Sequence, residues 1–323
     1  MLYLNDAHLL KLGINWSHLV KEVRSTARLL QEKDFSQPIK PYLRYKDLKN
    51  RIIAMPAYIG GGNPGAGIKW IASFPDNIAK GIPRAHAVTI LNDVYTGQPL
   101  ATFNSGLLSQ IRTASVTGLV VEEFMSAQPH RKGLTVGING FGPIGRTHLQ
   151  MFESLFGDRI DKYLVYDLQQ SKTAQLPGYL QDKIRVMDSW HAVYEPSAIF
   201  VTCTVSKERY VNIPPPKGSL QLNISLRDYM PEYRQYVDLM IVDDWEEVCR
   251  ENTDIEQMYR HSGLQQADTI SLGELICDKK LYETAQDAVI MFNPMGMAVF
   301  DITVARYFYQ LASEEQAGVV LED

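Results

Sequence analysis

The stretch Leu134-Thr-Val-Gly-Ile-Asn-Gly-Phe-Gly-Pro-Ile-Gly145 decides the fold, because an apolar segment runs directly into the pattern Gly140-x-Gly142-x-x-Gly145. The first glycine permits a tight turn from strand to helix, the second lets the backbone approach a pyrophosphate, and the third lets helix and strand pack closely. The N-terminus of the following helix offers free N–H groups and a partial positive charge to phosphates. We therefore predict a dinucleotide site formed by Gly140, Gly142, Pro143, Ile144 and Gly145.

An acidic residue follows at the position that such a site requires. The segment Lys162-Tyr-Leu-Val-Tyr-Asp167 predicts a second buried strand that ends at Asp167, roughly 20 residues beyond Gly145. A carboxylate there can accept both hydroxyls of the adenosine ribose, and it repels a 2′-phosphate. The sequence therefore predicts NAD as the cofactor, in preference to NADP.

Two patterns of segments divide the chain. From residue 135 to residue 292, short apolar segments alternate with helical patterns or loops, as a parallel, doubly wound sheet requires. Before them, short segments at 39–44, 51–58, 67–73, 87–91 and 100–104 follow one another with only turns between them, which predicts antiparallel pairing. Helical patterns over 5–33 and 299–314 can cover that second sheet.

These patterns predict an α/β protein with two domains, as expected for 323 residues. The Rossmann dinucleotide-binding domain is expected over residues 114–299. Residues 1–113 and 300–323 are expected to form an α+β domain with a mainly antiparallel sheet. This domain is expected to bind the substrate.

Composition and charge narrow the class of partner. The net charge is −5 without any block of like charge, which argues against a nucleic acid or an anionic membrane as partner. The N-terminus lacks the basic region and apolar run of a signal peptide, and no stretch approaches the roughly 18 apolar residues of a membrane span. We expect a cytoplasmic protein that acts on small molecules. Neither histidines nor cysteines show metal-ligand spacing, so no metal is expected.

Three cations in the antiparallel domain are candidates for substrate binding, namely Arg44, Lys69 and Arg112. Lys69 alternates with Ile68 and Trp70, which we expect to be buried, so it is expected on the opposite face of its strand. A bidentate arginine suits a carboxylate, whereas a lysine can also exchange a proton with an amine or a carbonyl group. Taken singly, each cation is more simply explained as a solvated surface charge.

The segments Gly67-Ile-Lys69, Ser109-Gln-Ile-Arg-Thr-Ala-Ser115 and Asn293-Pro-Met-Gly-Met-Ala-Val-Phe-Asp301, with Arg44 and the glycine pattern, resemble the ornithine cyclodeaminase/μ-crystallin family in order and spacing. The resemblance covers essentially the whole chain. It implies a homodimer built through the antiparallel domain, a substrate cleft between the domains, and an NAD-linked step at an amine-bearing carbon.

The same resemblance implies roles for individual residues. Arg44, Lys69 and Arg112 correspond to residues that hold the substrate carboxylate, with Lys69 nearest the reacting centre and therefore the candidate acid/base group. Thr113 corresponds to a contact with the cofactor phosphates. Asn293 and Asp301 are also expected to contact the cofactor.

Within the family, the runs Gln37-Pro-Ile-Lys-Pro-Tyr-Leu-Arg44 and Val242-Asp-Asp-Trp245 look most like the branch that makes 2,3-diaminopropionate. This implies NAD-dependent oxidative hydrolysis of N-(2-amino-2-carboxyethyl)-L-glutamate to 2-oxoglutarate and L-2,3-diaminopropionate, for a siderophore or related natural product. Asp228 is a second catalytic candidate, because cyclodeaminases carry an aspartate in a D-x-x-G-K-x-E-like stretch. Asn223-Ile-Ser-Leu-Arg-Asp228-Tyr-Met-Pro-Glu232 lacks the Gly-Lys, which counts against ornithine cyclisation.

Other functions stay open at this point. A different family reaction is one alternative, such as ornithine cyclodeamination or the reduction of a ketimine. A nucleotide-binding protein without enzymatic activity, like μ-crystallin in its binding roles, is another. The presence of Arg44, Lys69 and Arg112 together disfavours a purely binding role.

Overall fold

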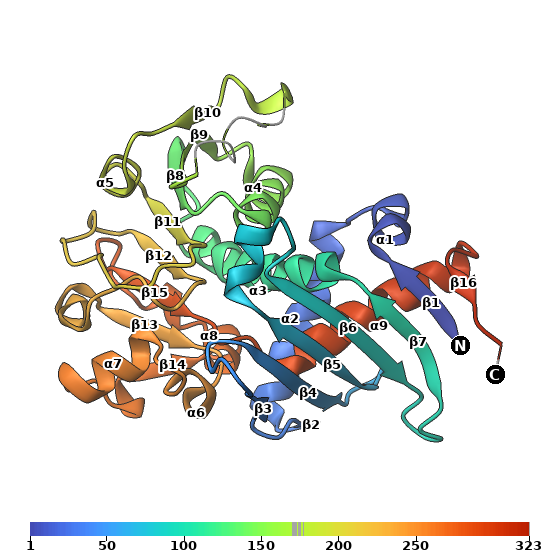
Figure 1. Ribbon diagram of the computed structural model, residues 1–323. Coiled ribbons are helices and arrows are strands. Elements are labelled where there is room, and N and C mark those ends of the chain that lie inside the picture. The colour runs from blue at the N-terminus through green and yellow to red at the C-terminus, as the bar shows by residue number, and fades with distance from the viewer. Residues whose placement is uncertain (170–172, 174–175, 177, 323) are drawn as a thin grey trace. The chain divides into compact units, whose positions relative to one another are not determined.

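Two units, each built on its own sheet, make up the chain (Figure 1). The computed structural model describes residues 1–169, 173, 176 and 178–322. Unit 1 consists of Met1–Val116 and Met297–Asp323, and unit 2 of Thr117–Gly296. Within the described residues, no helix combines the length and apolar character needed to cross a bilayer.

The sheet of unit 1 has the strand order β16-β1-β7-β6-β5-β4-β2, with β3 paired to β4. Its four long strands, β4 to β7, pair antiparallel in sequence order, which confirms the predicted antiparallel sheet. β1 adds to β7 in parallel. The strands are β1 (Leu2–Asn5), β2 (Phe35–Ser36), β3 (Tyr42–Leu43), β4 (Arg51–Ile59), β5 (Gly65–Ser73), β6 (Ala85–Asn92), β7 (Pro99–Asn104) and β16 (Val319–Val320).

Several strands of unit 1 differ from the prediction, in which β1, β2 and β16 were absent. The strand expected over 39–44 shrinks to Tyr42–Leu43, because Pro38 and Pro41 have no N–H to donate to a neighbouring strand. β1 carries too short a pattern to be recognised, since its four residues are ordered by pairing with β7, about a hundred positions away.

Helices cover one face of this sheet. α1 (Asp6–Leu12) and α2 (Trp16–Glu32) each begin after an asparagine, and the side chains of Asn5 and Asn15 accept backbone N–H bonds of these helices. α9 (Ala298–Glu314) packs against β4 and β5 and is joined to α2 by a 2.7 Å hydrogen bond between the hydroxyls of Thr26 and Thr303. α3 (Gly106–Ala127) follows β7, and a 3₁₀ helix spans Pro75–Lys80.

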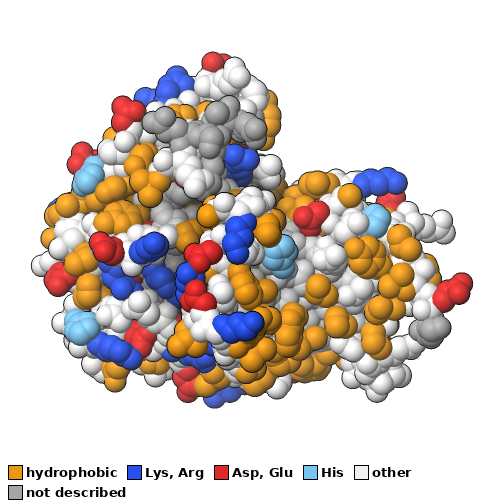
Figure 2. Space-filling model, viewed as in Figure 1, with side chains coloured by type: hydrophobic (Ala, Val, Ile, Leu, Met, Phe, Trp, Pro, Cys, Tyr) orange, Lys and Arg blue, Asp and Glu red, His pale blue; other side chains and the backbone are white. Residues whose placement is uncertain are grey.

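The other face of the sheet is apolar and open. Tyr58 of β4 and Trp70 of β5 are 38% and 46% exposed, and hydrophobic side chains gather over β4 to β7 in Figure 2. The predicted burial of Trp70 is therefore wrong, although the predicted alternation is confirmed: Lys69 points to the helix-covered face and Trp70 to the open one.

Unit 2 contains a wholly parallel sheet with the order β10-β9-β8-β11-β12-β15-β13-β14, which confirms the doubly wound prediction. The strand order reverses between β8 and β11, and ligands of such sheets bind at this switch point, beyond the carboxyl ends of the strands. The strands are β8 (Leu134–Asn139), β9 (Ile160–Tyr166), β10 (Ile184–Val186), β11 (Ile199–Thr202), β12 (Leu220–Asn223), β13 (Leu239–Val242), β14 (Thr269–Ser271) and β15 (Ile290–Asn293).

Helices accompany these strands, as parallel pairing demands. They are α4 (Pro143–Phe156), α5 (Trp190–Tyr194), α6 (Trp245–Val248), α7 (Asp254–His261) and α8 (Leu272–Cys277). β11, β12 and β15 are buried along their whole length, so the centre of the sheet forms the core of the unit.

Candidate active site

The turn after β8 has the geometry of a dinucleotide loop. Gly140 has φ +95°, a conformation that side chains other than glycine rarely adopt. A Cβ at this position would also lie 2.5 Å from the carbonyl oxygen of Cys203, in the segment that follows β11. Only glycine therefore allows the chain to turn this tightly at the switch point.

The next two glycines serve different purposes. A Cβ on Gly145 would lie 2.2 Å from the carbonyl oxygen of Gly140, so this glycine lets α4 pack onto the turn. Gly142 caps α4 with an ordinary φ of −74°, and a Cβ there would meet no atom within 4 Å. The backbone conformation at Gly142 therefore does not require glycine. The absence of a side chain instead leaves space beside the helix N-terminus, and that space fits a pyrophosphate.

Asp167 lies beside the same turn. One carboxylate oxygen of Asp167 accepts the backbone N–H of Phe141 at 2.8 Å, and the other accepts the N–H of Gln169 at 2.8 Å. The acidic residue and the glycine turn are therefore held together, as a site for the adenosine ribose requires. Pro143 and Ile144 form the first turn of α4 beside them. The donors and the space present fit a dinucleotide.

Asp228 lies in a buried polar network of unit 2. Its side chain is completely buried, and its carboxylate accepts hydrogen bonds from the hydroxyls of Thr204, Tyr210 and Ser225. The hydroxyl of Tyr210 also accepts an N–H of Asn139, at the end of β8. This arrangement ties together the segments that follow β8, β11 and β12, and it favours a structural role for Asp228.

A second buried aspartate supports this network. Asp254 accepts Nε of Arg209 at 2.7 Å, the amide of Asn223 at 3.0 Å, and backbone N–H groups of Asp228 and Tyr229. Burial, aided by the charge of Asp228, raises the pKa of Asp254 from 3.8 to about 6. Asn223 also donates to Asn293 at 2.8 Å, so Asn293 is fixed at the end of β15 by neighbouring side chains.

In unit 1, the structure brings together three of the predicted site residues. One carboxylate oxygen of Asp301, Oδ1, accepts Nζ of Lys69 at 2.9 Å and Nε of Arg112 at 3.0 Å. Lys69 comes from β5, Arg112 from α3, and Asp301 from the first turn of α9. We call these three residues the Lys69 cluster.

The cluster is almost sealed from solvent. Lys69, Arg112 and Asp301 are 2%, 7% and 1% exposed, so the interpretation of Lys69 and Arg112 as solvated surface charges is wrong. Nζ of Lys69 also donates to Oγ of Ser109 at 2.6 Å. Among the described residues, the terminal nitrogens of Arg112 have no hydrogen-bond partner and Oδ2 of Asp301 is a buried acceptor without a donor.

Burial changes the proton affinity of this cluster. It lowers the pKa of Lys69 from 10.5 to about 8; the negative charge of Asp301 opposes this decrease, and the positive charges of Arg112 and Lys40 add to it. Burial also disfavours ionisation of Asp301, but Arg112 and Lys69 outweigh that effect and hold the pKa of Asp301 below 3.8. Lys69 can therefore gain or lose a proton near neutral pH, which suits an acid/base group.

Two further predicted residues have contacts within unit 1. Arg44 donates to the carbonyl of Leu48 at 2.8 Å and lies over the ring of Tyr42. Thr113 donates to the carbonyl of Ser109 within α3.

Two residues near the cluster were missed. Ser109 precedes Arg112 by one helical turn, so helical spacing was the available signal. Lys40 is 3% exposed, and only the fold reveals that it is buried near Lys69.

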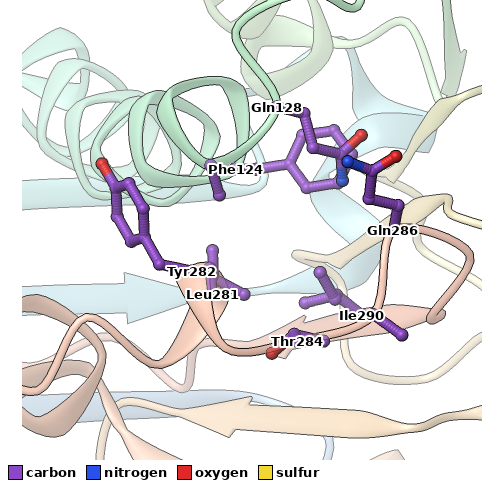
Figure 3. A pocket seen from close by; sticks show the side chains of 9 residues that line it. Phe124, Gln128, Leu281, Tyr282, Thr284, Gln286 and Ile290 are labelled. Carbon is purple, nitrogen blue, oxygen red and sulfur yellow. The ribbon is translucent and has the colours of Figure 1, made fainter.

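Unit 2 also contains a small pocket. It lies between α3 and the segment that leads into β15, where Phe124, Gln128, Leu281 and Ile290 line it (Figure 3). Ile290 begins β15, whereas the glycine turn follows the end of β8. Because all strands of this sheet are parallel, the pocket lies at the amino ends of the strands and the dinucleotide turn at their carboxyl ends.

Known proteins with similar sequences and structures agree with this fold. A family model described as "Ornithine cyclodeaminase/mu-crystallin family" matches residues 6–215. The chain is 34% identical to N-((2S)-2-amino-2-carboxyethyl)-L-glutamate dehydrogenase of Staphylococcus aureus, over 99% of this chain and 98% of the relative.

Two solved structures have the same fold. The Δ1-pyrroline-2-carboxylate reductase of Thermococcus litoralis, in complex with NADH and L-proline, matches with a TM-score of 0.89 at 23% identity, over 99% of this chain and 100% of that one. An archaeal alanine dehydrogenase dimer with bound NAD matches with a TM-score of 0.86 at 23% identity, over 100% and 99% of the two chains. On the family match and the sequence identity over nearly the whole length, the chain belongs to the ornithine cyclodeaminase/mu-crystallin family.

Proposed function

We propose that the protein is an NAD-dependent oxidoreductase that acts on the CH–NH group of N-(2-amino-2-carboxyethyl)-L-glutamate. The products are 2-oxoglutarate and L-2,3-diaminopropionate. The observation that carries the proposal is the buried pairing of Lys69 and Arg112 on Asp301, in a chain 34% identical to a dehydrogenase of this adduct. A group that changes protonation near neutral pH beside a carboxylate-binding arginine is what this reaction needs.

The cofactor is assigned to the glycine turn of unit 2. The pyrophosphate takes the room beside Gly142 and the N-terminus of α4, and Asp167 accepts the ribose hydroxyls. We keep Thr113 and Asn293 as proposed cofactor contacts. When bound, NAD⁺ supplies a hydride acceptor for the glutamate α-carbon.

The cations of unit 1 take the carboxylates of the substrate. The adduct carries three carboxylates, and the terminal nitrogens of Arg112 can bind one of them in a bidentate manner. We propose that Arg44 binds a second one at the edge of the site. A substrate with a single carboxylate needs fewer of these contacts, so several cations favour the adduct.

Lys69 acts as the general acid/base group of the reaction. Oxidation of the C–N bond converts the secondary amine to an imine, and water then adds to the carbon and releases 2-oxoglutarate and diaminopropionate. Overall, the adduct, NAD⁺ and one water give the two products, NADH and one proton. Neutral Lys69 takes a proton from the amine or from the attacking water, and its pKa of about 8 allows the proton to be released again.

We further propose a homodimer formed through the open face of the unit 1 sheet. The support is the apolar character of that face, where Tyr58 and Trp70 are exposed, and the dimer described for the archaeal alanine dehydrogenase. An exposed apolar patch of this kind is typical of an interface. We assign the reaction to the cytoplasm, where NAD⁺ and 2-oxoglutarate occur, and to the supply of diaminopropionate for a siderophore or related natural product.

The stoichiometry of NADH tests the proposed function. Purified protein, NAD⁺ and the adduct should give one NADH for each 2-oxoglutarate formed. A cyclodeaminase would instead turn ornithine into proline with catalytic NAD⁺ and no net NADH. A reductase would consume NADH with Δ1-pyrroline-2-carboxylate. Turnover with either of those substrates, and none with the adduct, would contradict the proposal.

A further inference from the structure

We propose that Asp301 is a positioning residue that acts through Lys69: its Oδ1 atom fixes the side chain of Lys69 next to Arg112 and sets the proton affinity of Lys69. The inference rests on the proposed function, in which Lys69 is the acid/base group. It gives Asp301 a role different from the cofactor contact that the family resemblance implied.

Oδ1 of Asp301 lies between the two cations of the cluster. This single oxygen accepts one hydrogen bond from Lys69 at 2.9 Å and one from Arg112 at 3.0 Å. Two cations that share one acceptor repel each other, and the repulsion is strong where water is excluded. The carboxylate between them is therefore what allows the two side chains to stay next to each other.

Two hydrogen bonds hold the ammonium group of Lys69. Its ammonium group has three protons, of which one goes to Asp301 and one to Oγ of Ser109 at 2.6 Å. Asp301 on α9 and Ser109 on α3 hold Nζ from two elements, so the direction of the remaining proton is fixed. Loss of the bond to Asp301 leaves Nζ held by Ser109 alone.

Three charged side chains face Lys69. Asp301 faces it from α9, Arg112 from α3, and Lys40 from the segment that precedes β3. Gln37 accepts the backbone N–H of Val299 at 3.1 Å, which ties that segment to the start of α9. Of these three charges, only that of Asp301 favours the protonated form of Lys69.

The second carboxylate oxygen supports a functional reason for Asp301. Oδ2 is buried and has no hydrogen-bond donor among the described residues. A buried acceptor without a donor is destabilising, so a residue kept only to join helices would be expected to satisfy both oxygens. Asp301 retains its full charge beside Lys69 despite this cost.

The experiment compares Asp301→Asn, Asp301→Glu and a matched control in the full-length protein. Asp301→Asn keeps the size of the side chain and removes its charge, and Asp301→Glu restores the charge at a different reach. The control is Glu22→Gln, which also removes a carboxylate from an ion pair with α9, the one with Arg306 at 3.0 Å, but lies outside the Lys69 cluster.

Two measurements are made on each protein. The first is the pH dependence of kcat/KM for NADH formation from the adduct. The second is the titration of Lys69 itself, followed by NMR on protein labelled with ¹³C at the lysine ε-carbon, where Lys69→Arg assigns the signal. The NMR titration needs no substrate, so it tests the positioning role even if the proposed reaction is not the right one.

We expect the NMR midpoint of Lys69 to fall by about 1–3 pH units in Asp301→Asn. The pH at which kcat/KM rises as Lys69 loses its proton should fall with it. The plateau of kcat/KM should fall about 10-fold or more, because the neutral amide oxygen of the variant orients Nζ through a weaker hydrogen bond than the carboxylate does. Asp301→Glu should restore most of the midpoint, and Glu22→Gln should match the wild type.

An unchanged midpoint in Asp301→Asn, together with lost activity, would assign Asp301 to holding the helices only and overturn the inference. If Asp301→Asn does not fold, Arg112→Gln gives the complementary test, because removal of a neighbouring positive charge should raise the Lys69 midpoint above about 8. A midpoint that stays the same or falls in Arg112→Gln would also overturn it. A shifted midpoint in a protein that forms no NADH would refute the proposed reaction alone.

Discussion

Replacement of Gly142 by alanine separates cofactor binding from folding. The backbone at Gly142 has φ −74° and ψ −166°, which alanine adopts without strain, and the added Cβ would meet no atom within 4 Å. The substitution should therefore leave the fold intact. The free energy of unfolding should stay the same or increase by about 0.4–1 kcal/mol, because alanine restricts the unfolded chain.

The effect on cofactor affinity follows from the same geometry. If the pyrophosphate occupies the room beside Gly142, a methyl group displaces it by about 1.5 Å, the length of one carbon–carbon bond. That displacement breaks at least one charge-assisted hydrogen bond from the N-terminus of α4, at about 1.5–3 kcal/mol. The Kd for NAD⁺ should then rise by about 10-fold to 100-fold.

Calorimetric titration with NAD⁺ and urea denaturation measure the two quantities on the same sample. Gly62→Ala is the matched control, because a Cβ there also meets no atom within 4 Å and the residue lies in unit 1. Gly145→Ala gives the opposite pattern, since its Cβ would lie 2.2 Å from the carbonyl of Gly140 and should destabilise the fold. Wild-type affinity for NAD⁺ in Gly142→Ala would refute the assignment of the pyrophosphate to this room.

Four further predictions follow from other residues. Lys69→Ala should lower turnover by about 10²-fold or more with NAD⁺ binding intact, as kinetics and titration will show. Asp167→Ser should reduce the preference for NAD⁺ over NADP⁺, measured as a ratio of Kd values. If the proposed dimer forms through the open face of the unit 1 sheet, Trp70→Glu should convert it to monomers in light scattering. Burial lowers the pKa of His148 from 6.5 to about 4, so the unfolded state takes up the proton first; the free energy of unfolding should fall by up to about 3 kcal/mol from pH 6.5 to 4, and less in His148→Asn.

The parts of the fold that could be predicted are those encoded locally. The glycine pattern and the alternation of apolar segments with helices determine a parallel sheet, because each element carries its own signal over consecutive residues. β1 and β16 carry no such signal, since strands of four and two residues are ordered by distant partners. The burial of Trp70 was predicted wrongly for a related reason: a strand pattern indicates two faces, but not which face the helices cover.

The site was predictable only in part. The residue types of Lys69 and Arg112 indicated carboxylate chemistry, whereas their burial depends on α9, which lies about 190 residues beyond Arg112 in the sequence and supplies Asp301. Arg44 and Lys40 share one short segment, yet Lys40 is the buried one. Spacing along a chain cannot distinguish such neighbours, because their burial depends on which other parts of the unit pack against each of them.

The burial of Lys69 is itself what makes this lysine suitable for chemistry. A lysine with an ordinary pKa of 10.5 has about one molecule in a thousand neutral at pH 7.5, which is too few for a base. With the pKa lowered to about 8, a far larger share of the molecules is neutral at that pH. Burial and Arg112 favour the neutral form and Asp301 the charged form, so the carboxylate keeps the side chain able to gain a proton as well as lose one. An enzyme that takes a proton in one step and returns it in another needs both states, and under the proposed function one carboxylate oxygen between two cations would provide that balance.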